Sequence, residues 1–243
     1  MNLSVDIKKK LGEFELNIKV DTGRDVLALV GASGCGKSMT MKCIAGIERP
    51  DSGRIVLNGR VLFDSEKHID LPPKERRVGY LFQQYALFPN MTVLQNVMAG
   101  VRKSSAGKAG NAEQTARAML ERFGISDIAG KHPHEISGGQ QQRTALARIM
   151  VNEPDVLLLD EPLSALDPYL RYTLAMEMKE VLESFDKEII LVSHSMDEIE
   201  ILAKNMIVIN RGEIVREGSV DEVFEEPGSD YTANIIDPWH RKA

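Results

Sequence analysis

Three short apolar runs constrain the fold of this chain more than any other feature of its sequence. They are VLALV at 26–30, VLLL at 156–159 and IILV at 189–192. A continuous apolar run predicts a strand that is buried on both faces, as in a parallel sheet. Between the second and third runs, apolar residues recur at helical spacing over 170–185, and Pro168 suits the first turn of that helix. Strands that alternate with helices predict the α/β class with a mainly parallel sheet.

Two other patterns surround this core. Apolar and polar residues alternate over 3–7 and 14–20 around Gly12, which predicts an N-terminal antiparallel pair of strands, and MIVIN, RG and EIVREG near the end predict another hairpin. Segments 111–123 and 139–150 have helical spacing instead. We therefore expect one domain over 1–243, with a helical subdomain at about 84–150 inserted into a catalytic core made of 1–83 and 151–243.

Composition excludes several classes of protein. The formal net charge is −6, which disfavours a nucleic-acid partner held by broad phosphate neutralisation. The two cysteines, Cys35 and Cys43, provide no disulfide framework. No apolar run approaches the ~18 residues of a membrane span, so we expect any membrane role to come through a partner.

The segment GASGCGKS at 31–38 fits the pattern G-x-x-x-x-G-K-[ST] and follows a buried strand. Its glycines allow the backbone to curl so that successive N–H groups point at an anion. Lys37 offers a charge to the β- and γ-phosphates of a nucleotide, and the Ser38 hydroxyl can ligate Mg²⁺. The alternative is a glycine-rich turn without a nucleotide.

A second motif, VLLLDE at 156–161, ends a buried strand in two carboxylates. Ligands of α/β sheets bind at this carboxyl edge, where Asp160 would hold Mg²⁺ and Glu161 would polarise a water for attack on the γ-phosphorus. By itself the motif is weak, because acidic residues also end strands as caps and turns. Together with the phosphate loop it predicts a nucleoside triphosphatase.

Four further motifs extend this prediction. ISGGQQQR at 136–143 resembles the signature motif of ATP-binding-cassette (ABC) ATPases, usually written LSGGQ. In the order typical of that family, Gln83 resembles the Q-loop glutamine, Ser164–Asp167 (SALD) resembles the D-loop, and His194 resembles the switch histidine. A soluble P-loop switch or kinase is the main alternative, and it would lack the signature motif.

The resemblance implies an ATP site with Mg²⁺, shared between two copies that pair head to tail. The implied catalytic residues are Glu161, His194 and Gln83, and the implied metal site is Ser38, Gln83 and Asp160. The implied ATP-binding residues are Phe14, Gly31, Ala32, Ser33, Gly34, Cys35, Gly36, Lys37, Ser38 and Met39. The signature residues Ser137, Gly138, Gly139 and Gln140 would serve the partner's γ-phosphate, and Asp167 would bridge the dimer. Phe14 would stack on adenine, although it is nearer to the loop than the family's usual tyrosine and could be a core residue instead.

The stretch YALFPNMTVLQNV closely resembles bacterial importer ATPases, in which this region receives a helix of the membrane permease. The implied protein is a peripheral subunit on the cytoplasmic face of the membrane, with permease subunits as partners and an extracytoplasmic solute-binding protein as an indirect one. The N-terminal hairpin and NGRVLFDS resemble molybdate- and sulfate-type importers. Polyamine, sugar or ferric iron importers remain alternatives, as does a non-transport ABC protein. We expect no C-terminal regulatory domain in this chain.

The sequence also makes a prediction about Cys35. Its neighbours in the loop are glycines, and Lys37 and the following helix should favour its thiolate. We expect Cys35 to be accessible and Cys43 to be buried. The alternative is a Cys35 sulfur tucked beneath the loop.

Overall fold

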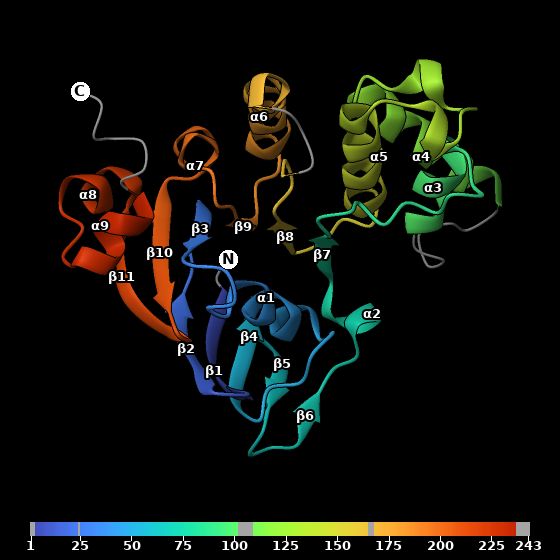
Figure 1. Ribbon diagram of the computed structural model, residues 1–243. Coiled ribbons are helices and arrows are strands. Elements are labelled where there is room, and N and C mark those ends of the chain that lie inside the picture. Colours follow the sequence, from blue (N-terminus) through green and yellow to red (C-terminus); the bar gives the residue numbers. More distant parts are fainter. Residues whose placement is uncertain (1–2, 24, 102–108, 165–167, 237–243) are drawn as a thin grey trace.

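The computed structural model describes residues 3–23, 25–101, 109–164 and 168–236 (Figure 1). Within these ranges, all strands join one sheet in the order β6-β5-β4-β1-β2-β11-β10-β3-β9-β8-β7. Helices cover both faces of the parallel part of this sheet. Among the described residues, no helix has both the length and the apolar character that crossing a membrane requires.

The parallel part of the sheet contains the three apolar runs. They form β3 (Val26–Val30), β8 (Val156–Asp160) and β9 (Glu188–Val192), and β7 (Val78–Leu81) and β10 (Asn205–Asn210) flank them. The pairs β10–β3, β3–β9, β9–β8 and β8–β7 are all parallel. The α/β prediction is confirmed.

The antiparallel part contains β1 (Leu3–Leu11), β2 (Phe14–Asp21), β4 (Ser52–Leu57), β5 (Arg60–Asp64) and β6 (Ile69–Asp70). The predicted hairpin is confirmed, since β1 pairs with β2 around Gly12. The second predicted hairpin is β10 with β11 (Glu213–Ser219). The two parts of the sheet meet where Glu213 of β11 pairs with Asn17 of β2.

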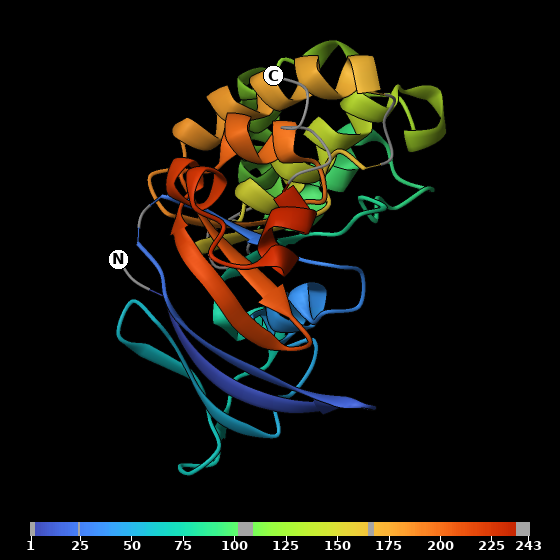
Figure 2. The same ribbon diagram turned by 60° about the vertical axis from the view of Figure 1, so that its left-hand side comes forward.

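Most of the described helices follow β7. The stretch after β7 contains α3 (Val93–Gly100), α4 (Ala109–Arg122), the 3-10 turns Ser126–Ile128 and Pro133–Glu135, and α5 (Gly138–Met150). The later helices are α6 (Pro168–Glu183), α7 (Met196–Leu202), α8 (Val220–Glu225) and α9 (Asp230–Ile236). Figure 1 shows α3–α5 at the end of the molecule opposite to α8 and α9, and in Figure 2 the turn brings α8 and α9 to the front.

Alternate residues of the central strands build two cores. Leu157 and Leu159 of β8 face the side covered by α5 and α6, whereas Val156 and Leu158 face the phosphate-loop helix α1 (Lys37–Ala45). Successive side chains of a strand point to opposite faces, so a fully apolar strand fills both cores. A third cluster joins β3 and β10 to α7, α8 and α9.

The C-terminal end of α1 is held by a buried arginine from α2 (Pro73–Arg76). Arg76 Nη1 donates to the carbonyl oxygens of Cys43 (2.7 Å) and Ile44 (3.0 Å), and Nε donates to Leu71 (2.7 Å). Its Nη2 pairs with Asp70 at 2.8 Å. The last carbonyl groups of a helix lack partners within it, and Cys43 also accepts from the Gly46 N–H at 3.2 Å, so the guanidinium and Gly46 together cap this end of α1.

Replacing Arg76 with Met should therefore lower the free energy of unfolding strongly. The change removes the arginine donors from the carbonyl oxygens of Cys43, Ile44 and Leu71, which we expect to cost about 3 kcal/mol. Urea denaturation would measure it. The control is Arg117→Met, which removes only an exposed i,i+4 pair with Glu113 and should cost less than about 0.5 kcal/mol. Equal losses in the two variants would contradict the capping role.

Candidate functional site

The phosphate loop leaves the carboxyl end of β3 and leads directly into α1. Gly31 and Gly36 both have positive φ, at 148° and 115°. A Cβ on Gly31 would lie 2.2 Å from the Ile209 carbonyl oxygen, and one on Gly36 would lie 2.5 Å from the Leu16 side chain. The glycines therefore meet both a conformational and a steric requirement of the loop.

Lys37 lies inside the curl of this loop. Its Nζ donates to the carbonyl oxygens of Gly31 (2.7 Å) and Ala32 (3.0 Å), and the residue is buried. These two bonds hold the ammonium group against the backbone of the loop. The loop thus combines a fixed positive charge with the start of a helix, an arrangement that suits a phosphate.

Two distant segments brace the loop, and neither was predicted to do so. The N–H of Gly212, in the β10–β11 turn, donates to the Cys35 carbonyl oxygen at 2.9 Å. On α9, the Tyr231 hydroxyl donates to Ile209 (3.0 Å) and accepts from the Ala32 N–H (3.1 Å). These contacts join residues that are far apart in sequence, so no local sequence pattern predicts them.

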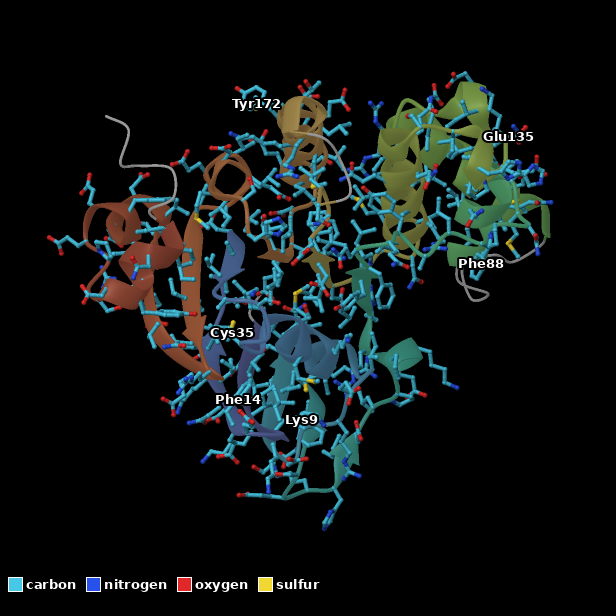
Figure 3. All side chains as sticks on the ribbon, in the orientation of Figure 1. Lys9, Phe14, Cys35, Phe88, Glu135 and Tyr172 are labelled. Carbon is cyan, nitrogen blue, oxygen red and sulfur yellow. The ribbon has the colours of Figure 1, made fainter. Side chains whose placement is uncertain are left out.

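The expectation of an accessible Cys35 is wrong. Its residue exposure is 5%, and its sulfur turns inward, where it packs in the core that surrounds α1 and lies 3.8 Å from Lys37 Nζ (Figure 3). The glycine neighbours leave the outside of the loop open, but the thiol points to its underside. Cys43 is buried as predicted, and burial raises the pKa of its thiol to about 11.

The remaining predicted ATP-binding residues differ in their burial. Ala32, Ser33 and Gly34 are exposed, and Met39 packs partly buried against the α1 core. Phe14 is half-buried at the start of β2, two residues before Leu16. Side chains two residues apart share a face of a strand. Phe14 is therefore on the same face of β2 as Leu16, whose side chain lies against Gly36 of the phosphate loop. Figure 3 shows it below Cys35.

Asp160 at the end of β8 meets the start of α1. Ser38 Oγ donates to Asp160 Oδ1 at 3.0 Å, and the Tyr80 hydroxyl donates to Asp160 Oδ2 at 2.8 Å. Burial, and then the hydrogen bond to Asp160, raise the pKa of Tyr80 well above its usual range, so its hydroxyl stays a donor. Tyr80 is a site residue that the sequence analysis missed.

The oxygen atoms of Ser38 and Asp160 fit Mg²⁺, which prefers oxygen ligands and keeps several water or phosphate oxygens. Among the described residues, no group of three or more His, Cys, Asp or Glu side chains could hold a metal ion.

Glu161 brings the two other predicted catalytic side chains together. Its Oε2 accepts from Gln83 Nε2 at 3.0 Å and lies 3.7 Å from His194 Nδ1. Gln83 follows β7, and His194 follows β9, so three neighbouring strands supply the cluster. Glu161 has φ = 49°, a left-handed conformation that is uncommon for a residue with a Cβ.

The signature residues form the start of α5. Ser137 is its N-cap: Ser137 Oγ accepts from the Gln140 N–H (3.3 Å), and Gln140 Oε1 accepts from the Ser137 N–H (3.0 Å). Gly138 and Gly139 form the first turn, where a Cβ on Gly139 would lie 2.9 Å from the Leu174 side chain of α6. Within the described ranges, these residues make no hydrogen bond to their own phosphate loop. Asp167 lies outside the described residues.

A buried carboxyl group lies close to the residues that flank His194. Glu198 on α7 has an exposure of 3%, and its Oε2 accepts from Ser193 Oγ at 2.6 Å. Ser193 Oγ in turn accepts from the Ser195 N–H at 3.0 Å, so this pair of bonds brackets His194. Burial raises the pKa of Glu198 to about 7, and the negative charge of Glu161 contributes in the same direction.

The loop and its neighbouring carboxylates have the arrangement of a P-loop domain. Comparison with known proteins narrows the class. Residues 14–164 match the ABC transporter family. The chain belongs to that family, which confirms the resemblance inferred from its motifs.

The relatives include proteins named for different solutes. The chain is 37% identical to a molybdenum import ATP-binding protein of Paramagnetospirillum magneticum, over 93% of this chain and 61% of that protein. It is 37% identical to a trehalose/maltose import protein of Thermococcus litoralis (96% and 63%) and 40% identical to an Fe³⁺ import protein of Brucella abortus (95% and 64%). The chain therefore spans less than two thirds of the length of these relatives.

Solved structures agree with the fold. The dimeric structure of the ATP-binding cassette MJ0796 in a post-hydrolysis state, bound to ADP and Pi, matches with a TM-score of 0.73 at 26% identity. The match covers 90% of this chain and 99% of that one. A second dimeric structure of the same cassette gives a TM-score of 0.72 at 27% identity.

Glu198 predicts a pH dependence of stability. Because its pKa is raised, the folded chain keeps a proton that the unfolded chain loses near pH 4–5, and stability falls as the pH rises through about 7. Replacing Glu198 with Gln removes the ionisable group but keeps an acceptor for Ser193. At pH 8 this variant should be more stable than the parent chain by about 2 kcal/mol, and the gain should shrink as the pH falls below about 7 and vanish below about pH 4.

Urea denaturation at several pH values would measure this difference. Glu180→Gln on α6 is the matched control, since Glu180 is exposed and its replacement should leave the profile unchanged. A gain for Glu198→Gln that is the same at pH 5 and pH 8 would contradict the prediction.

Proposed function

We propose that this chain is the ATP-hydrolysing subunit of a bacterial ABC importer. The observation that carries the proposal is the convergence of Gln83 and His194 on the Glu161 carboxylate, beside the Ser38–Asp160 pair. The import ATP-binding proteins among the relatives support the transport role.

In this proposal each side chain has a distinct task. Lys37 and the loop N–H groups hold the phosphates, and Phe14 contacts the adenine. Glu161 accepts a hydrogen bond from the attacking water and acts as its general base. His194 contacts the γ-phosphate and stabilises its developing charge. Gln83 lies between this site and the membrane partner.

Ser38 and Asp160, with Gln83, would hold Mg²⁺. The ion would supply positive charge to the phosphate oxygens. Tyr80 orients Asp160 through its 2.8 Å hydrogen bond and leaves the other carboxylate oxygen directed at Ser38.

A second copy of the chain completes the site. We propose that Ser137, Gly138, Gly139 and Gln140 approach the γ-phosphate bound by the partner copy, and that Asp167 contributes to the dimer contact. The absence of hydrogen bonds from the described signature residues to their own loop supports this arrangement, as does the dimeric form of the similar cassette MJ0796.

Membrane permease subunits are the other proposed partners. Phe82, Phe88 and Met91 expose 40%, 46% and 37% of their surface on the segment that follows β7, around Gln83. Exposed apolar side chains that are grouped on one segment suit a protein partner. The chain would then lie at the cytoplasmic face of the membrane, with a solute-binding protein as an indirect partner and no nucleic acid.

For the solute, we propose an oxyanion such as molybdate or sulfate. The molybdenum import relatives support this choice. The trehalose/maltose and Fe³⁺ relatives support a sugar or ferric iron instead, and a polyamine is a further candidate. A non-transport role in this family is the remaining alternative. We also propose that residues from about 84 to 150 form a helical subdomain inserted into a catalytic core made of 1–83 and 151–243.

Glu161→Gln should abolish turnover without loss of ATP binding. The amide keeps the size of the side chain but removes the base, and we expect the rate of phosphate release to fall at least 100-fold. An ATP-bound dimer should accumulate, which gel filtration with and without ATP would detect. A variant that hydrolyses ATP at a rate close to that of the parent chain would overturn the assignment.

Two inactive variants should restore activity when they are mixed. Ser137→Arg blocks the signature and Lys37→Ala disables the loop, but a mixed dimer retains one site in which both parts are intact. With free exchange, about a quarter of the parent activity should return. Recovery of no activity, or loss of ATP binding by monomeric Ser137→Arg, would contradict the shared site.

A further inference from the structure

The turn after β8 holds Glu161 in an unusual conformation. Its φ of 49° is sparsely populated for a residue with a Cβ, and such geometry persists only where the surroundings enforce it. Within the catalytic core, the Glu161 N–H donates to Val192 at 2.9 Å. The Glu161 carbonyl oxygen accepts from Ser164 Oγ at 3.0 Å and from the Ser164 N–H at 3.3 Å. These bonds fix the residue itself.

The next residue, Pro162, is held by two side chains from elsewhere. Its carbonyl oxygen accepts from the Tyr85 hydroxyl at 3.1 Å and from Gln142 Nε2 at 3.4 Å. Tyr85 lies two residues after Gln83, and Gln142 lies on α5, the helix that begins with the signature residues. Both donors are buried, with exposures of 5% and 2%.

Tyr85 is itself held by α5. Tyr85 and Ala86 both have positive φ, at 56° and 46°. Arg148 of α5 donates to their carbonyl oxygens at 2.9 Å and 2.8 Å, and its guanidinium lies 5.2 Å from the centre of the Phe88 ring. Two residues of α5 therefore act near Tyr85. Arg148 binds the backbone carbonyl of Tyr85, and Gln142 binds the same Pro162 carbonyl as the Tyr85 hydroxyl.

We propose that Tyr85 is a positioning residue for ATP hydrolysis: its hydroxyl, together with the Gln142 amide, holds the Pro162 carbonyl and thereby orients the Glu161 carboxylate. The inference rests on the proposed catalytic role of Glu161. Through these hydrogen bonds, a movement of α5, or of the segment around the exposed Phe88, changes the orientation of the Glu161 carboxylate. Burial, and then the negative charge of Glu198, raise the pKa of Tyr85 to about 12, so the hydroxyl is a hydrogen-bond donor throughout the physiological range.

Tyr85→Phe tests this role, because it removes one oxygen atom and keeps the ring. With Mg-ATP in excess, kcat should fall roughly five- to tenfold, which corresponds to one hydrogen bond. KM for ATP and the affinity for a fluorescent ATP analogue should not change. Tyr172→Phe is the matched control: Tyr172 is exposed on α6 and the same change there should leave kcat unaltered (Figure 3).

A second measurement separates positioning from general damage. If Tyr85 acts through Glu161, then Tyr85→Phe should cause no further loss of rate in a chain that already carries Glu161→Gln. Single-turnover hydrolysis, with the chain in large excess over ATP, would show this. Gln142→Met removes the other donor at similar volume and should lower kcat in the same way, which keeps the test valid if Tyr85→Phe folds poorly.

The outcomes distinguish this inference from the proposed function. No ATP hydrolysis by the parent chain would refute the proposed function. Normal hydrolysis with an unchanged kcat in both Tyr85→Phe and Gln142→Met would overturn the positioning role alone. A parallel loss of kcat and ATP affinity, or an additive loss in the Glu161→Gln background, would also overturn it.

Discussion

The site depends on the parallel pairing of three strands. β3, β9 and β8 are neighbours, with Leu29 of β3 opposite Val192 of β9 and Asp160 of β8 opposite the same Val192. In a parallel sheet, all carboxyl ends lie at one edge. The phosphate loop, the two carboxylates and His194 therefore meet there, although more than 150 residues separate Lys37 from His194.

Local sequence patterns predicted the parts of this arrangement that local physics controls. Continuous apolar runs identified β3, β8 and β9, and glycine spacing identified the loop. Helix α3 was missed, although Thr92 and Gln95 form a capping box that announces its start. Tyr80 and Tyr231 could not be found in this way, because their partners, Asp160 and Ala32, lie 80 and 199 residues away. For Cys35, the neighbouring glycines suggested an exposed thiol, but the direction of the side chain depends on the conformation of the loop.

Several features of the site oppose stability. Glu161 has a left-handed backbone, and Glu198 is a carboxyl group in a buried setting whose Oε1 has no hydrogen-bond partner among the described residues. Such features persist where the surrounding structure compensates for them. Here the compensation is visible in the two fully apolar faces of β8 and in the arginine cap of α1. The rigid sheet thus tolerates a strained turn at its edge, and that turn carries the proposed base.

The Tyr231 hydroxyl connects α9 thermodynamically to the phosphate loop. A single oxygen atom bridges the Ala32 N–H of the phosphate loop and the carbonyl oxygen of Ile209 at the end of β10. Any ligand that changes the preferred geometry of the loop must change the free energy of this bridge. Linkage is reciprocal, so a restraint placed on α9 must alter the affinity of the loop for its ligand by the same factor. Helix α9 therefore both supports the phosphate loop and can influence its affinity for a ligand.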